Sequence, residues 1–278
     1  MSLTYDSLEH LFDQYDAFLI DQFGVLMSGS GPYPGADVAL AALAARGKPV
    51  VVLSNSGKRS APNCARLVRN GFDRAHFDTV LTSGEIAYEH LAAEIGHTVP
   101  RRARVLVLIK DGDTPPLAGL NVIRTDTPDA ADLVLIVSRD PAKPIESYEP
   151  ILARLADRNV PGICVNPDLK MLTSQGLIAS AGQLGQMFQS LGGRLQWFGK
   201  PHPLIYDRAK ERLGTIRSES VLCIGDSLQH DIMGGGAAGF RTALVRTGVN
   251  AEVSDHDLER MIRSSKHKPD HFLSEFAI

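Results

Sequence analysis

The chain has 278 residues, of which 44% are hydrophobic and 22% charged, and its formal net charge is −3 at pH 7. This balance is typical of an ordinary globular protein, and the length predicts two domains or one large α/β unit. The sequence shows no clustered basic face, no signal peptide and no apolar run of ~18 residues. We therefore expect no nucleic-acid partner, no membrane partner and a cytoplasmic location.

The first buried strand is predicted at residues 17–20, where four apolar residues stand between Asp16 and Asp21. A short helix over 7–15 precedes it. In an open parallel sheet, ligands bind beyond the carboxyl ends of the strands, which is where we expect Asp21. An aspartate in this place is a nucleophile, a metal ligand or both, or it only ends the strand, and Asp21 alone does not decide between these roles.

Two helix–strand pairs follow and indicate the fold class. The helices are predicted over 36–46 and 60–70, and the strands over 49–53 and 77–81. This β-α-β-α-β order indicates a doubly wound parallel sheet. The second strand ends in small polar residues, Ser54, Asn55 and Ser56. We expect Lys58 and Arg59, just beyond them, to lie on the solvated surface.

A second series of strands and helices follows. Strands are predicted over 104–109, 132–137 and 162–165, and helices over 85–94, 147–158 and 183–191. Because ~100 residues is a usual domain size, we assign residues 85–192 to a second α/β domain, and 1–84 with 193–278 to the first. The acidic segment 110–113 is predicted to be a polar turn.

The last part of the chain again places polar residues after strands. Strands are predicted over 195–198, 221–224, 242–245 and 271–273, and helices over 203–213, 228–233 and 255–264. Lys200 follows the first of these strands, and Asp226 and Asp231 follow the second. The cysteines Cys64, Cys164 and Cys223 are odd in number and far apart, so we expect reduced thiols that act as small buried hydrophobes.

The segment 234–239, GGGAAG, matches the dinucleotide-binding pattern G-x-G-x-x-G. That pattern requires a strand before it and a helix after it, and here the predicted order is reversed. We therefore expect these glycines to end a helix and to let it pack closely on the sheet.

The polar residues at the strand ends form one chemical set. Mg²⁺ prefers a few carboxylate oxygens together with waters and phosphate oxygens, and Asp226 and Asp231 lie on one strand-to-helix turn. Ser54 and nearby backbone N–H groups can bind phosphoryl oxygens, and Lys200 can neutralise charge on the transferring group. Asp21, held beside the metal, can attack phosphorus and form an aspartyl-phosphate.

Four short motifs resemble those of the haloacid-dehalogenase-like (HAD) phosphohydrolases: D-x-x-G-V at 21–25, S-N at 54–55, G-K-P at 199–201 and G-D-S-x-x-x-D at 225–231. The long insert, with V-N-P-D at 165–168, is similar to the class IIA branch, whose members carry an α/β cap domain over a Rossmann-like parallel-sheet core. The resemblance covers nearly the whole chain and implies a Mg²⁺-dependent phosphatase acting on a small phosphorylated metabolite.

The resemblance also implies roles for individual residues. Asp21 is the expected nucleophile and Lys200 its catalytic partner. The expected phosphate- or substrate-binding residues are Ser54, Asn55, Ser56 and Asp168, although Asp168 in N-P-D serves equally well as a turn former. The expected metal ligands are Asp21, the backbone carbonyl of Phe23, Asp226 and, directly or through water, Asp231.

Phe23 departs from the family pattern, because family phosphatases normally have a second aspartate there, which protonates the leaving oxygen and then activates water. General acid–base catalysis contributes roughly 10²–10⁴ in rate, so we expect an intact site with slow hydrolysis. The alternatives are a substrate whose leaving group needs no proton, such as an acyl phosphate, or a stand-in histidine, His202 or His230. The side chain of Phe23 can also serve simply for apolar packing.

Two functions from different classes stay open. One is the HAD-like hydrolase, and the other is a non-catalytic protein that binds a phosphorylated ligand on the same fold. A phosphorelay receiver also phosphorylates a strand-end aspartate, but the G-D-S-x-x-x-D motif and the inserted domain argue against it. We expect a homodimer only because twofold dimers are common.

Overall fold

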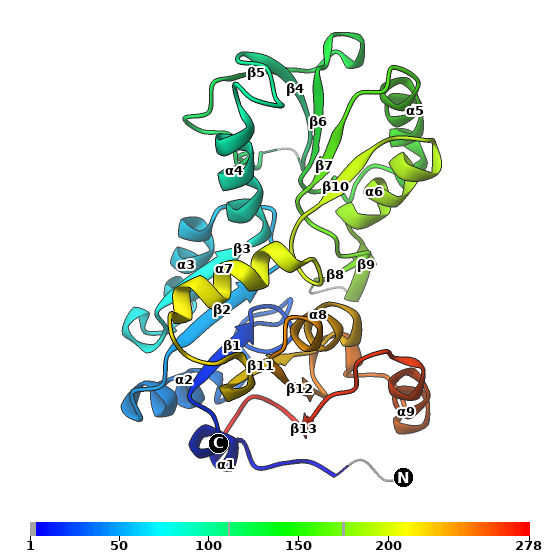
Figure 1. Ribbon diagram of the computed structural model, residues 1–278. Helices are drawn as coiled ribbons and strands as arrows, with labels where there is room; N and C mark the ends of the chain where they lie inside the picture. The colour runs from blue at the N-terminus through cyan, green and yellow to red at the C-terminus, as the bar shows by residue number, and fades with distance from the viewer. Residues whose placement is uncertain (1–3, 111, 174–175) are drawn as a thin grey trace.

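The computed structural model describes residues 4–110, 112–173 and 176–278. Figure 1 shows two α/β units stacked on one another, with both ends of the chain in the lower unit. The lower unit contains a six-stranded sheet in the order β13-β12-β11-β1-β2-β3, with every neighbouring pair parallel. Its strands are β1 Ala17–Asp21, β2 Val50–Ser54, β3 Thr79–Thr82, β11 Val221–Gly225, β12 Arg241–Val245 and β13 His271–Leu273.

Strand β1 lies between β2 and β11. Phe18 is opposite Val50 on one side, and Leu19 is opposite Cys223 on the other. Every residue of β1, β2 and β11 is buried, as expected for parallel strands covered on both faces. The carboxyl ends of these three strands therefore meet at one edge of the sheet and bring together the polar residues that follow them.

Helices cover both faces of this sheet. α1, α2 and α3 pack on the face that carries Phe18 and Ile20, and α4 and α7 pack on the face that carries Leu19. The helices of this unit are α1 Leu8–Gln14, α2 Ala36–Ala45, α3 Ser60–Arg69, α4 Ser83–Glu94, α7 Pro203–Leu213, α8 Met233–Ala237 and α9 Asp255–Ser264. Short 3₁₀ turns occur at Arg74–His76, Pro128–Ala130, Ile145–Tyr148, Ser218–Ser220 and Gly248–Asn250.

The upper unit contains a five-stranded parallel sheet in the order β10-β7-β6-β4-β5. Its elements are β4 Ala103–Leu108, β5 Val122–Thr125, β6 Leu133–Ile136, α5 Glu149–Asp157, β7 Gly162–Cys164, α6 Ala181–Ser190 and β10 Leu195–Trp197. Helices α5 and α6 pack on one face. The other face contributes Val105, Leu135 and Ile163 to an apolar cluster that also contains Ile86 of α4 and Ile205 of α7. One cluster therefore spans the junction between the two units.

An antiparallel hairpin, β8 Lys170–Thr173 and β9 Gly176–Ala179, extends from the upper unit toward the lower one (Figure 1). None of the helices in the described part of the chain has the length and apolar character needed to cross a bilayer.

The predicted α/β class, with a Rossmann-like parallel sheet, is confirmed, and several details differ. Strand β5 and the hairpin are not predicted by the sequence pattern, because they are short and carry exposed side chains. The strand expected at 195–198 falls in the first unit of the predicted division. In the structure Trp197 of β10 is paired with Cys164 of β7, so the second sheet extends to this strand.

The expectation that the glycines at 234–239 end a helix is confirmed for Gly239, which has a φ of +86° directly after the C-cap residue of α8, and is wrong for the three glycines at 234–236. Residues Leu228–Ile232 form a π-helical turn, and Gly234 and Gly235 lie inside the following helix α8. Their role in close packing is confirmed, because a Cβ on Gly235 would lie 3.1 Å from the Cys223 side chain of β11. A Cβ on Gly234 would lie 2.5 Å from the Tyr206 hydroxyl.

Candidate active site

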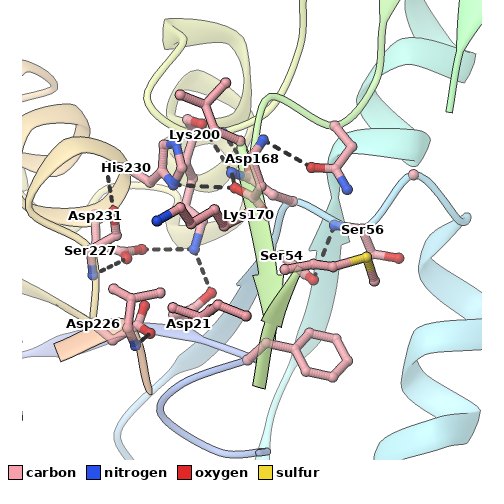
Figure 2. Close-up of a pocket in the computed structure, with 18 of the residues that line it drawn as sticks. Asp21, Ser54, Ser56, Asp168, Lys170, Lys200, Asp226, Ser227, His230 and Asp231 are labelled. Atoms are coloured by element: carbon pink, nitrogen blue, oxygen red, sulfur yellow. Dashed lines mark hydrogen bonds and ion pairs between the residues drawn. The ribbon is translucent and has the colours of Figure 1, made fainter. Parts of the chain in front are cut away.

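The strand ends bring the predicted polar residues into one pocket (Figure 2). Asp21 and Ser54 are the last residues of β1 and β2, and Asp226 directly follows β11. Lys200 enters from the loop after β10, and Asp231 from the π-helical turn. The whole pocket has a volume of about 740 Å³ and is lined by residues of both units.

Lys200 is the buried cation at the centre of the site. Its Nζ atom lies 2.5 Å from Asp21 Oδ1 and 2.7 Å from Asp231 Oδ1, and its side chain is 2% exposed. Burial alone lowers the pKa of a lysine, but the two carboxylates outweigh this effect and hold the pKa of Lys200 above its ordinary value. Lys200 therefore stays charged and fixes the orientation of Asp21.

Three buried carboxylates surround this lysine. One oxygen each of Asp21, Asp226 and Asp231 lie within 4.8 Å of one another. Burial raises the pKa of Asp21 well above its ordinary range, with Asp231 and Asp226 adding to the effect and Lys200 opposing it. Burial, followed by the charge of Asp231, raises the pKa of Asp226 to about 7. The raised pKa values show that simultaneous ionisation of all three carboxyl groups is unfavourable without further positive charge, because one ammonium group does not neutralise three carboxylates.

The donor set fits a divalent cation. When all three carboxyl groups are ionised, they and the one ammonium group leave two negative charges in excess, which one divalent ion would balance. Asp21 Oδ2 is buried and has no hydrogen-bond partner among the described residues, so a ligand atom is available. Hard carboxylate oxygens are the ligands of Mg²⁺ and Ca²⁺ rather than of softer metals.

The loop after β12 positions Asp226. The backbone N–H of Val249 donates to Asp226 Oδ2 at 2.8 Å, and the side-chain amide of Asn250 donates to the Asp226 carbonyl. Gly24 and Gly248 stand against the same carboxylate with φ values of +107° and +62°. A Cβ would lie 2.0 Å from Asp226 Oδ2 at Gly24 and 1.8 Å from it at Gly248. Gly24 belongs to the first sequence motif, whereas no sequence signal points to Gly248.

Asn55 connects the two units at the pocket. Its amide nitrogen donates to Asp168 Oδ1 at 2.7 Å and to the Lys200 carbonyl at 3.0 Å, while its Oδ1 accepts from the Lys200 backbone N–H at 2.7 Å. His230 Nδ1 lies 3.2 Å from the same Asp168 oxygen. Asn55 therefore holds the lysine loop and Asp168 in place, and its contact with phosphate stays a prediction.

The second motif continues as a turn of hydroxyl and N–H groups. Ser56 N–H donates to Ser54 Oγ at 3.3 Å, and Lys58 N–H donates to Ser56 Oγ at 3.3 Å. Both hydroxyls line the pocket, as their predicted phosphate contacts require. Lys58 and Asp113, predicted as solvated surface and polar turn, also line it and form an ion pair of 2.8 Å between the units. Sequence reasoning missed this pair because its members come from separate units.

Phe23 lines the pocket and packs against the apolar cluster between β1 and helices α1 to α3. The guanidinium carbon of Arg66, on α3, lies 5.5 Å from the centroid of the Phe23 ring. The side chain at this position thus has a packing role, and its hydrocarbon ring has no proton to donate to a leaving group.

The fold and the set of side chains after the strand ends define a haloacid dehalogenase-like hydrolase. A family model of that description matches residues 18–122, and one described as HAD-hydrolase-like matches residues 197–277. The acid sugar phosphatase of Staphylococcus aureus is 30% identical over 242 residues, which cover 85% of this chain and 88% of the relative. The chain belongs to the HAD-like hydrolase family and is a phosphatase-like hydrolase, as the sequence predicts.

Solved structures agree with this assignment. A haloacid dehalogenase-like hydrolase from Brucella suis 1330 has a TM-score of 0.84 and 26% identity, and the match covers 98% of this chain and 99% of the other. A possible sugar phosphatase of the HAD superfamily from Cytophaga hutchinsonii has a TM-score of 0.84 and 25% identity, with coverage of 100% and 99%. The likeness extends over both units of the fold.

Proposed function

We propose that the protein is a Mg²⁺-dependent phosphohydrolase that cleaves a small phosphorylated metabolite through an aspartyl-phosphate on Asp21. The observation that carries this proposal is the buried cluster in which Lys200 contacts both Asp21 and Asp231. The S. aureus relative is named an acid sugar phosphatase, and sugar phosphates are therefore the first substrates to test.

In the proposed reaction, a carboxylate oxygen of Asp21 attacks phosphorus, and the bond from phosphorus to the leaving oxygen breaks. Water then cleaves the aspartyl-phosphate, which regenerates Asp21 and releases inorganic phosphate. Lys200 holds Asp21 through Oδ1 and offsets the negative charge of the phosphoryl group. The hydroxyl of Ser54 and the N–H groups of the turn around Ser56 bind phosphoryl oxygens.

We propose Asp21, Asp226, Asp231 and the backbone carbonyl of Phe23 as the groups that hold the metal. When bound, Mg²⁺ supplies positive charge that offsets the repulsion between the carboxylate nucleophile and the phosphate dianion. Asp226 is aligned for this role by Val249 and Asn250. Around this site, we propose that residues 1–84 and 193–278 act as the catalytic core and 85–192 as the cap, except that α4 packs on the core sheet and β10 belongs to the cap sheet.

The Phe23 side chain affects the expected rate of hydrolysis, because it cannot act as a general acid. Without an acid at this position, the leaving oxygen departs unprotonated unless another group donates, so the protein should favour good leaving groups such as acyl or aryl phosphates. The same observation supports the second candidate function, a protein that binds a phosphorylated ligand with little turnover.

One experiment separates the two functions. Sugar phosphates, aryl phosphates and an acyl phosphate are screened for phosphate release with Mg²⁺, using wild type, Asp21→Asn and a control, Asp16→Asn, at the exposed other end of β1. Release that requires both Asp21 and Mg²⁺ supports the hydrolase. Release that survives Asp21→Asn rules out the covalent mechanism. Thermal stabilisation by a phosphorylated ligand without any release supports the binder.

A further inference from the structure

We propose that Arg66 is a specificity-determining residue that binds a second anionic group, a carboxylate or a phosphate, on the leaving part of the substrate. This inference rests on the proposed phosphohydrolase function and names its substrate class. The substrate is then a phosphate ester whose leaving part carries a second negative charge, rather than the phosphate ester of an uncharged sugar.

Arg66 is directed toward the pocket by its contact with Phe23. It lies on α3, it lines the pocket together with Phe23, and its guanidinium carbon is 5.5 Å from the centroid of the ring. An aromatic face restricts an arginine side chain and holds it by a cation–π interaction, while the N–H groups at the edge of the guanidinium stay available as donors. Phe23, which stands two positions after the proposed nucleophile in the sequence, thus gives Arg66 a defined position at the pocket.

Arg66 forms no ion pair with a carboxylate in the described part of the chain, although it is partly buried. The neighbouring Arg59 differs, because it donates two hydrogen bonds to Glu85 at the start of α4. A cation that is partly removed from water without a counter-ion is unfavourable, and an anionic ligand would relieve this cost. The difference between the two arginines marks Arg66 as the one available to a ligand.

Two lysines of the upper unit face the same pocket. Lys110 follows β4 and Lys170 begins β8, and both line the pocket without an ion pair among the described residues. Lys58 also lines it but is paired with Asp113. Cations from a core helix, a cap strand end and the hairpin therefore converge on one space, which strengthens the attraction for an anion.

We infer from the exposure of these cations that they contact the leaving part of the substrate rather than its phosphoryl group. The phosphoryl group is taken by the buried Asp21, Lys200 and Ser54, whereas Lys110 and Lys170 line the same pocket with exposed side chains. The pocket volume of about 740 Å³ is that of a site for a whole small molecule rather than for phosphate alone. A second anion bound by these cations would thus lie toward the solvent-exposed part of the pocket.

The test compares matched substrates that differ in one anionic group. The first pair is 3-phosphoglycerate and glycerol 1-phosphate, and the second is fructose 1,6-bisphosphate and fructose 6-phosphate. The kcat/KM for phosphate release is measured with wild type, Arg66→Gln, Arg66→Lys and Arg69→Gln. Arg69 is the control, because it lies exposed on the same helix and does not line the pocket.

We expect wild type to prefer the anionic member of at least one pair, and the pair that shows this preference tells carboxylate from phosphate. Arg66→Gln should reduce that preference by about tenfold or more, which is the effect of losing one charge-assisted hydrogen bond. The kcat/KM for the member that lacks the second anionic group should not change. Arg66→Lys should restore part of it, and Arg69→Gln should change nothing. An equal loss for both members of a pair, or a wild type without preference, overturns the inference.

Binding measurements distinguish a failure of the Arg66 inference from a failure of the proposed phosphohydrolase function. The same pairs are titrated calorimetrically into Asp21→Asn and into Asp21→Asn combined with Arg66→Gln, with Mg²⁺ present. If wild type releases no phosphate from any substrate, the hydrolase proposal fails. The Arg66 proposal then stands if Arg66→Gln removes a binding preference for the anionic member, and it fails if no such preference exists.

Discussion

His230 Nδ1 lies 3.2 Å from Asp168 Oδ1, the same oxygen that accepts a hydrogen bond from Asn55. A carboxylate that contacts one ring nitrogen of a histidine orients the ring and leaves the other nitrogen for a different partner. His230 lines the pocket, where Phe23 offers no proton. These contacts make His230 a candidate for the group that protonates the leaving oxygen.

We predict that His230→Asn slows the hydrolysis of alkyl phosphates by about 10²-fold, within the usual range for a general acid. Aryl phosphates, whose leaving groups need little protonation, should be affected much less. The control is His202→Asn, because His202 also adjoins a motif but stacks on Trp197 and does not line the pocket. A similar loss with both classes of substrate would show that His230 has only a structural role.

The second prediction concerns Phe23. We expect Phe23→Asp to raise the hydrolysis of p-nitrophenyl phosphate by about tenfold or more, because it introduces a carboxyl group where the family has the residue that activates water against the aspartyl-phosphate. Phe23→Asn is the matched control, since it loses the same packing without gaining an acid. Both variants should be checked by thermal unfolding. If the folded Phe23→Asp protein is no faster than wild type, the missing acid does not limit the rate.

The third prediction uses the close approach of Gly248 to Asp226. Gly248→Ala should weaken Mg²⁺ binding by at least about tenfold, because the added Cβ occupies the space of Asp226 Oδ2 and displaces a metal ligand. Gly47→Ala is a suitable control, since Gly47 has a similar φ of +63° but no atom within 4 Å of the added Cβ. Calorimetric titration with Mg²⁺ measures the difference. Equal affinities in the two variants would remove Gly248 from the metal site.

The fourth prediction is a dependence of stability on pH. Burial raises the pKa of Asp226 to about 7, so this group stays protonated in the metal-free folded protein while it already ionises in the unfolded chain near pH 4. The metal-free protein should therefore lose stability as the pH rises from about 4 to about 7. Thermal melts in EDTA should show this loss, and Asp226→Asn should reduce it.

Mg²⁺ should reverse the trend, because the ion binds ionised carboxylates and stabilises the folded state by mass action. The increase in melting temperature on adding Mg²⁺ should thus be larger at pH 8 than at pH 5. Equal increases at the two pH values would contradict the idea that these carboxylates hold the ion.

The sequence alone predicts the parallel-sheet fold and the polar residues that gather at the strand ends, for a physical reason. Buried parallel strands read as short apolar runs, and their carboxyl ends share one edge, so Asp21, Ser54 and Asp226 can be placed together without coordinates. Contacts between residues far apart in the sequence leave no pattern in the local sequence. The Lys58–Asp113 ion pair and the position of Arg66 against Phe23 depend on tertiary packing, and only the structure shows them.

The apolar cluster that contains Ile86, Val105 and Ile205 crosses the junction of the two units. Because its side chains come from both sheets, opening either unit would expose apolar surface belonging to the other. The inserted segment is for this reason an integral part of the folding unit, and the protein should unfold by heat or denaturant as one cooperative body. Substrate is then expected to enter without opening this junction.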